Sequence, residues 1–213
     1  MLYYTGRGYI RVGFNIPIKQ KNGDILTDKH IVLASASPRR KALLEDFGFD
    51  FETCASGADE DGTDGMSPAD TVKTLALRKA MWVKQRRADD NSIFLGADTL
   101  VYANGALLGK PKDSGDAFRM LSALSGTFHE VYTGMALLRG EKQITCAECT
   151  RVFFRNLSPD EIRAYIASGE PADKAGAYGI QGKGGLFVSR IEGDYFNVLG
   201  LPVCRLYQIL RDF

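Results

Sequence analysis

The chain has 213 residues, of which 45% are hydrophobic and 25% charged, so it is long enough for one large domain or two small lobes. Its 27 basic and 26 acidic residues leave a formal net charge of +1, which excludes a broad basic surface for nucleic acid or an anionic membrane. The sequence has no apolar run of about 18 residues and no secretory leader pattern. We therefore expect a cytoplasmic protein.

The four cysteines are too few and too scattered for a disulfide scaffold, which is typical of a reducing compartment. Cys146 and Cys149 form a C-x-x-C pair inside a segment with strand character, whereas a redox pair would open a helix and a zinc site would need two more ligands. We interpret them as two partly buried thiols. His30 and His129 lie near no serine or cysteine in a nucleophile arrangement, so a histidine-based hydrolase is not expected.

The first part of the chain predicts an extension followed by a strand and a helix. Residues 1–28 show strand alternation and a turn, and we assign them no function. Residues 31–34 predict a short buried strand. A helix then begins with Ser37 as its N-cap and Pro38 at its first position, and it ends near Gly48.

The next part predicts a second strand at 49–55, an acidic loop and a long helix. The acidic loop, residues 56–67, is rich in Asp and Gly and too polar to pack. The helix begins near Pro68 and carries Lys79 beside an apolar stripe. A lysine in that position can point into a cleft.

The remaining segments alternate strands with helices, and no internal repeat is present. They are a central strand at 92–103 with a turn at Asn104-Gly105, a helix at 114–124, long strands at 128–140 and 142–157, a helix at 158–169 with a Ser158/Glu161 capping box, a glycine-rich loop, a strand at 186–193 and a helix after Pro202. This order predicts an α/β protein with a mixed sheet, in which residues 29–213 form one domain of two lobes.

Two segments have the residue types of a phosphate-handling site. Residues 35–41, SASPRRK, place hydroxyls, free backbone N–H groups and two arginines at a helix start, which captures phosphate or is an ordinary helix cap with solvated arginines. Asp98 lies inside an apolar strand, where a carboxylate is costly unless it is paired or binds a metal. We favour a functional Asp98 over a carboxylate satisfied by backbone donors.

Three further segments leave alternatives open. Lys110 follows a glycine in a sequence that is not a Walker A loop, and it either reaches a phosphate or is a solvated lysine at a turn. The glycine-rich segment 173–185 allows close backbone approach to a ligand but is equally compatible with a structural loop. The acidic loop offers carboxylates for Mg²⁺ or Mn²⁺, although most such runs are solvated; they are Asp59, Glu60, Asp61 and Asp64.

The ordered motifs LASASPRRKALL, LGADTLV, LLGKP, DKAGAYGIQGKGG and NVLGLP resemble the Maf family of septum formation proteins over residues 31–213. The resemblance implies a nucleoside triphosphate pyrophosphatase that needs a divalent metal and forms a homodimer. It also implies two α/β lobes around an extended mixed sheet with a central cleft, similar to the inosine triphosphate pyrophosphatase fold. A housekeeping role in the nucleotide pool and a link to cell-division arrest follow from the same resemblance.

The resemblance also implies roles for individual residues. Asp98 matches the catalytic carboxylate and, with Glu60, the metal ligands, and Ser35 and Arg40 match the phosphate-facing pair. The lysines that match those lining the family's cleft are Lys79, Lys110 and Lys174.

Three positions separate branches of the family. Arg39, Thr99 and Gln181 match the branch acting on dTTP and UTP, whereas a branch acting on 7-methyl-GTP carries tryptophan, glutamine and glutamate there. An arginine and an amide offer hydrogen bonds to a pyrimidine edge, whereas tryptophan gives a methylated purine a stacking surface. The rivals are a purine- or 7-methyl-GTP-directed pyrophosphatase and a non-enzymatic inhibitor of septum formation that binds nucleotide.

Overall fold

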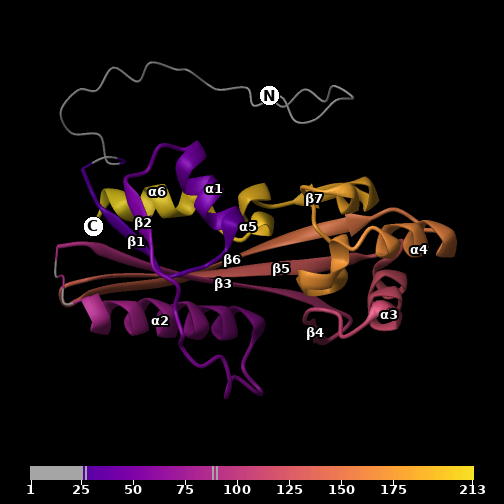
Figure 1. Cartoon of the computed structure of the whole chain (residues 1–213), viewed down its shortest axis with the longest axis horizontal. Coiled ribbons are helices and arrows are strands. Elements are labelled where there is room, and N and C mark those ends of the chain that lie inside the picture. Colours follow the sequence, from indigo (N-terminus) through magenta and orange to yellow (C-terminus); the bar gives the residue numbers. More distant parts are fainter. Residues whose placement is uncertain (1–25, 27, 88, 90) are drawn as a thin grey trace.

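The structure, a computed structural model, describes residue 26 and residues 28–87, 89 and 91–213. The expected strand and turn of the N-terminal extension lie outside these residues. The described chain folds around a mixed seven-stranded sheet, as the sequence predicted (Figure 1). The strands are β1 Ile31–Leu33, β2 Phe51–Thr53, β3 Ile93–Ala103, β4 Ala106–Leu108, β5 Phe128–Arg139, β6 Lys142–Phe154 and β7 Val188–Glu192.

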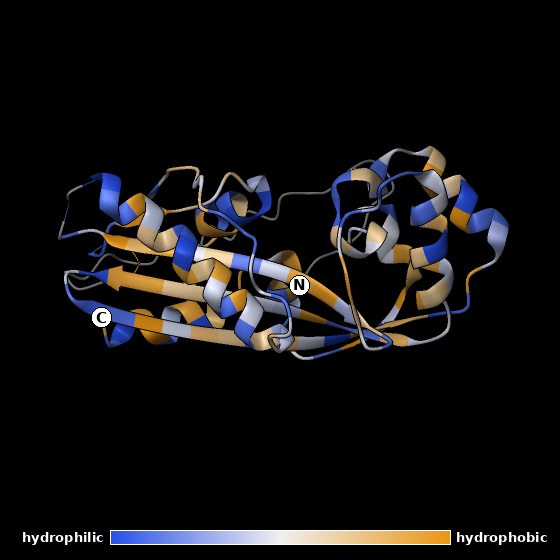
Figure 2. Ribbon diagram, turned by 90° about the horizontal axis from the view of Figure 1, so that it is seen from below, coloured by the Kyte–Doolittle hydropathy of each residue, from blue (hydrophilic) through white to orange (hydrophobic). Residues whose placement is uncertain are grey.

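The sheet has a parallel half and an antiparallel half that meet at β3. The strand order is β2-β1-β3-β5-β6-β7, and the short β4 pairs with β3 off this path. β2, β1 and β3 run parallel, and β3, β5, β6 and β7 are successively antiparallel. The long strands β5 and β6 are joined by a tight turn and pair along their whole length. Because they are long, they extend the sheet from one lobe into the other (Figure 2).

Helices cover both faces of the sheet and one of its ends. α2 lies on one face, α1 and α6 lie on the other, and α3 and α4 gather at the far end (Figure 1). Each of the three regions has its own cluster of buried apolar side chains. The helices are α1 Pro38–Asp46, α2 Pro68–Arg87, α3 Ser114–Leu124, α4 Pro159–Ala167, α5 Tyr195–Leu199 and α6 Val203–Arg211, with 3₁₀ turns η1 Glu170–Asp173, η2 Ala175–Ala177 and η3 Lys183–Phe187.

Local signals placed several helix ends correctly. α1 begins at Pro38 with Ser37 as N-cap, and Gly48 follows its end with a φ of 73°. The Ser158/Glu161 capping box of α4 is present in both directions. The side chain of Ser37 makes no capping hydrogen bond, however, and the short α5 was not predicted.

Two glycines let α2 lie directly on the sheet. A Cβ on Gly96 of β3 would lie 2.0 Å from the carbonyl oxygen of Ala76, and one on Gly134 of β5 would lie 2.3 Å from that of Val72. No side chain fits in this space, so the backbone of α2 contacts the backbones of β3 and β5. This close packing sets the height at which the later turns of α2 pass over β3.

The C-x-x-C pair lies in β6, as its strand character predicted. Cys146 is partly buried, but Cys149 is exposed, so the expectation of two partly buried thiols was wrong for Cys149. Residues three apart in a strand point to opposite faces of the sheet, so the two thiols do not face each other. Within the described residues, no helix is long and apolar enough to cross a membrane.

Candidate active site

A cavity of about 710 Å³ lies between the two lobes, and its walls come from α1, the acidic loop, α2, β3, the glycine-rich segment and the end of α5. All of the residues to which the family resemblance assigns roles line it except Ser35, and of the four acidic-loop carboxylates only Glu60 does. Ser35 is buried behind the wall and accepts a hydrogen bond from Arg40 through its Oγ at 3.1 Å. Segments from opposite ends of the sequence therefore meet in one cavity.

The sheet leaves an open edge where the cavity lies. β1 pairs with β3 up to Leu95, and β4 pairs with β3 only from Val101. Between these points, no described strand pairs with that edge of β3, and Asp98 and Thr99 lie in the gap. The opposite edge is continuous with β5, which keeps the backbone of this stretch rigid.

Asp98 points to the α2 side of the sheet and forms an ion pair with Lys79. Lys79 Nζ lies 2.5 Å from Asp98 Oδ1 and 2.7 Å from Glu60 Oε1 of the acidic loop. The side chains of Lys79 and Asp98 are only 15% and 14% exposed, whereas that of Glu60 is 63% exposed. Burial raises the pKa of Asp98 above its ordinary value, although Lys79 and then Arg40 act in the opposite direction.

Thr99 points to the other face of the sheet, where Arg40 of α1 holds it. Arg40 donates from Nη2 to Thr99 Oγ1 at 3.0 Å and from Nε to the carbonyl oxygen of Gly200 at 2.8 Å. Thr99 Oγ1 also lies 2.9 Å from Thr133 Oγ1 of β5. Burial lowers the pKa of Arg40, and the nearby charge of Asp98 opposes this effect. The Arg40 guanidinium therefore joins α1, β3 and α5 at the wall of the cavity.

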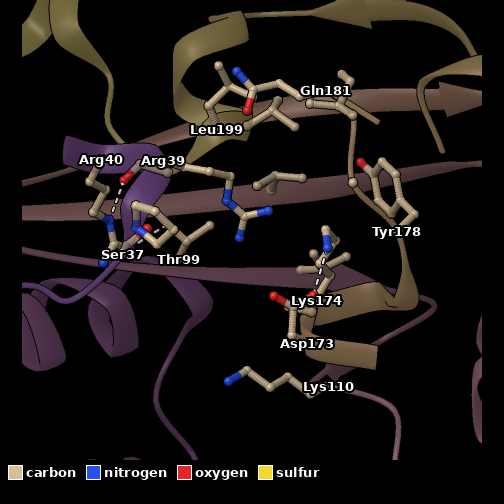
Figure 3. A pocket seen from close by; sticks show the side chains of 18 of the residues that line it. Ser37, Arg39, Arg40, Thr99, Lys110, Asp173, Lys174, Tyr178, Gln181 and Leu199 are labelled. Carbon is tan, nitrogen blue, oxygen red and sulfur yellow. Dashed lines mark hydrogen bonds and ion pairs between the residues drawn. The ribbon is translucent and has the colours of Figure 1, made fainter. Parts of the chain in front are cut away.

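The remaining cations approach the cavity from opposite sides. Figure 3 shows Arg39 extending from α1 into the cavity, with Lys174 and Lys110 facing it from the far lobe. Lys174 Nζ is held by Asp173 Oδ1 at 2.6 Å and by the carbonyl oxygen of Glu170 at 2.8 Å. An anion of triphosphate size in this cavity can contact positive charge from both lobes.

Two carboxylates of the cavity could hold a cation. Asp98 and Glu60 both contact the same Lys79 nitrogen, so their oxygens lie close to one point. Oxygen ligands of this kind suit Mg²⁺ or Mn²⁺, particularly when substrate phosphates complete the coordination. Within the described part of the chain, no group of three or more His, Cys, Asp or Glu residues is arranged to hold a metal.

Two polar side chains that line the cavity, Tyr178 and Glu170, were not named as candidates from the sequence. Tyr178 donates to or accepts from Nε2 of the buried His129 at 2.8 Å, and burial lowers the pKa of that histidine to about 4. Glu170 accepts hydrogen bonds from the backbone N–H groups of Lys183 and Gly184. Tyr178 stood within a segment already selected for its glycines, but no local signal marked Glu170, because its backbone donors are more than ten residues away.

The family model described as "Maf-like protein" matches residues 30–213. The chain belongs to the Maf family. A relative from Bacillus cytotoxicus named dTTP/UTP pyrophosphatase is 51% identical over 185 residues, which cover 87% of this chain and 96% of the relative. A Bacillus cereus relative of the same name is also 51% identical over 185 residues, covering 87% of this chain and 90% of the relative.

Among solved structures, the Ham1 protein of Staphylococcus aureus aligns over 86% of this Maf-family chain and 99% of its own length. The sequence identity is 10% and the TM-score is 0.48.

Proposed function

We propose that this protein is a nucleoside triphosphate pyrophosphatase that hydrolyses dTTP and UTP to the nucleoside monophosphate and pyrophosphate. The observation that carries the proposal is the cavity in which Asp98 and Lys79 face cations from both lobes. The names of relatives that are about half identical over most of the chain support the same activity. We place the catalytic machinery in one domain, residues 29–213.

The charges of the cavity suit a triphosphate. We assign Arg39, Lys110 and Lys174 to direct contact with the phosphates, because they extend into the cavity (Figure 3). Ser35 and Arg40 act one step behind them: Arg40 contributes its charge to the wall, and Ser35 helps hold its guanidinium. Fixed positive groups of this kind stabilise the charge that builds up on pyrophosphate as it leaves.

Asp98 and Glu60 are the residues we assign to a divalent cation, Mg²⁺ or Mn²⁺. Their oxygens converge on Lys79, and hard cations prefer such carboxylate ligands. When bound, the cation would supply Lewis-acid polarisation of the phosphate oxygens. Lys79 contacts both carboxylates and so holds them close together.

The reaction breaks the bond between the α-phosphorus and the bridging oxygen to the β-phosphate. We propose that Asp98, or a neighbouring carboxylate, orients a water molecule toward the α-phosphorus and accepts its proton as the new P–O bond forms. The electron pair of the broken bond leaves with pyrophosphate, where the lysines neutralise it. Burial raises the pKa of Asp98, which makes it a better base than an exposed aspartate.

Polar groups at the cavity wall distinguish one nucleobase of the substrate from another. Arg39, Thr99 and Gln181 line the cavity, and we propose that they recognise the pyrimidine directly or through the neighbouring backbone. Thr99 has less freedom than the other two, because its hydroxyl is bonded to Arg40 and Thr133. A wrong nucleobase would cover these polar groups without pairing them, which is how polar pockets discriminate strongly.

The first test is pyrophosphate release from a panel of dTTP, UTP, modified uridine triphosphates, CTP, GTP and 7-methyl-GTP with Mg²⁺, Mn²⁺ or EDTA. We expect metal-dependent release confined to dTTP, UTP and their analogues. Preference for GTP or 7-methyl-GTP would replace the pyrimidine assignment with a purine one. Nucleotide binding without release from any substrate would favour the non-enzymatic inhibitor of septum formation.

The second test is Asp98→Asn, which keeps the shape of the side chain but removes its charge and basicity. We expect turnover to fall by about 10³-fold or more, with an unchanged circular dichroism spectrum and an unchanged fold. A variant that turns over dTTP at near the wild-type rate would exclude Asp98 as the catalytic carboxylate.

The family resemblance supports three further proposals about the biology of the protein. We propose that it forms a homodimer, acts in the cytoplasm on the nucleotide pool, and has a link to cell-division arrest. Light scattering at micromolar concentration tests the first of these. A mass of one chain would contradict it.

A further inference from the structure

Gln181, one of the three residues assigned to base recognition, lies in a short segment that is held on both sides. On one side, the backbone N–H of Gly179 donates to the hydroxyl of Tyr165 at 3.1 Å. On the other, the N–H groups of Lys183 and Gly184 donate to the carboxylate of Glu170 at 3.0 and 3.2 Å. These bonds fix the backbone on both sides of Gln181.

The two acceptors are themselves joined. The hydroxyl of Tyr165 donates to Glu170 Oε1 at 2.9 Å, so one hydroxyl and one carboxylate form a continuous template for residues 179–184. Tyr165 is 4% exposed, and its ring packs edge-on against Phe187 with centroids 4.9 Å apart. The template is therefore anchored in the apolar core of the far lobe.

The glycines of this segment fit around the template. A Cβ on Gly182 would lie 2.2 Å from Glu170 Oε1, and one on Gly184 would lie 2.7 Å from the hydroxyl of Tyr165. Gly169, with a φ of 76°, turns the chain at the end of α4 and so brings Glu170 beneath the segment. The glycine-rich composition follows from the space that the two side chains occupy.

Glu170 keeps its negative charge under ordinary conditions. Burial acts to raise the pKa of Glu170, but the donors from Lys183, Gly184 and Tyr165 outweigh it, and the net pKa is below the ordinary value. Burial raises the pKa of Tyr165, so its hydroxyl keeps the proton that it donates. Both groups are thus in the protonation states that the hydrogen bonds require.

We propose that Glu170 and Tyr165 are a positioning pair that holds residues 179–184 against the cavity and thereby sets the selectivity for the base. The positioning of residues 179–184 does not depend on the proposed pyrophosphatase function, whereas the effect on base selectivity rests on it. The pair acts through Gln181 and does not perform the chemistry. Its contribution is therefore expected in substrate binding and discrimination more than in the turnover of bound substrate.

The test compares Glu170→Gln with the wild-type protein. A glutamine of the same shape has one acceptor oxygen in place of two, and its NH₂ group would face a donor, so at least one of the three donors loses its partner. We expect amide hydrogen exchange in residues 179–185 to become roughly 10-fold faster or more. We expect KM for dTTP to rise and the preference of kcat/KM for dTTP over GTP to fall by roughly 10-fold, with kcat little changed.

Two other variants complete the experiment. Gly182→Ala places a methyl group where the Glu170 carboxylate lies, so we expect the same faster exchange, higher KM and lower selectivity. This second variant keeps the test decisive if Glu170→Gln folds poorly. Glu161→Gln is the matched control, because it also removes a carboxylate that accepts a backbone N–H near α4, but it lies in the capping box away from the cavity. We expect the control to change neither exchange in residues 179–185 nor selectivity.

The possible outcomes separate this inference from the proposed function. Unchanged exchange in both Glu170→Gln and Gly182→Ala would overturn the positioning role, whether or not the protein is an enzyme. Faster exchange with unchanged selectivity would overturn the link to base recognition. Absence of pyrophosphate release from the wild-type protein would refute the proposed function, while the exchange data would still decide the role of Glu170.

Discussion

Gly96 connects the packing of the sheet to the geometry of the ion pair between Lys79 and Asp98. In Gly96→Ala, the new Cβ would lie 2.0 Å from the carbonyl oxygen of Ala76 and 2.8 Å from the backbone nitrogen of Ala80. A carbon and a carbonyl oxygen need roughly 3.3 Å, so α2 must move away from β3 by about 1.3 Å. Both obstacles are backbone atoms, so no change of rotamer relieves the clash. We expect the free energy of unfolding to fall by roughly 2–4 kcal/mol.

The same displacement affects the site, because Lys79 lies on the moving helix. Its Nζ contacts Asp98 at 2.5 Å and Glu60 at 2.7 Å, and a shift of this size opens the first of these contacts. A misplacement of about 1 Å in a catalytic group can cost roughly 100-fold in rate. We therefore expect kcat/KM for dTTP to fall by about 10- to 100-fold at temperatures where the variant remains folded.

Urea denaturation and pyrophosphate release measured on the same preparations test both parts of this reasoning. Met81→Ala is the control, since Met81 lies on the same helix, is 42% exposed and contributes little to packing. We expect its free energy of unfolding to stay within about 0.5 kcal/mol of the wild-type value. Wild-type stability and activity in Gly96→Ala would show that α2 does not rest on the backbone of β3 in this way.

Two substitutions in the cavity test its electrostatics. Lys79→Met removes the cation that lowers the pKa of Asp98, so that pKa should rise further and the acid limb of the pH profile of kcat/KM should move to higher pH. Lys73→Met, which lies outside the cavity, is the control and should leave the acid limb in place. An unmoved acid limb in Lys79→Met would contradict the pairing of Lys79 with Asp98. In Arg40→Lys, the lysine cannot satisfy the three oxygen acceptors that the guanidinium joins, so thermal denaturation should show that the free energy of unfolding falls by roughly 2–4 kcal/mol. A wild-type Tm would mean that these hydrogen bonds contribute little to stability.

Local patterns in the sequence predicted most of the elements. The helix at 114–124 was predicted with the bounds it has in the structure, and the Asn104-Gly105 turn has the positive φ angles, 51° and 81°, that its residues favour. These features depend on neighbours within a few residues, so the sequence contains their signals directly. The short α5 was missed because a five-residue helix carries too little periodicity to be recognised.

Some residues of the candidate site were also recognised from local patterns, whereas the roles of others depend on distant contacts. The cost of burying a carboxylate in an apolar strand identified Asp98, and the position of Lys79 beside an apolar stripe indicated that it faces a cleft. The role of Glu170 was not visible, because its acceptor function depends on donors 13 and 14 residues away that only the folded loop brings near. The burial of Ser35 behind Arg40 was likewise hidden in the motif SASPRRK.

By itself, the sequence determined which segments form strands and helices, and which residue types are available for phosphate chemistry. Only the tertiary structure decided that β3 has an open edge between Leu95 and Val101, that Lys79 joins Asp98 to Glu60, and that a carboxylate shapes the loop around Gln181. The physical reason is the range of the interactions. Hydrogen bonds within a turn or a helix cap follow from adjacent residues, whereas contacts between distant segments depend on how the whole sheet and its helices pack.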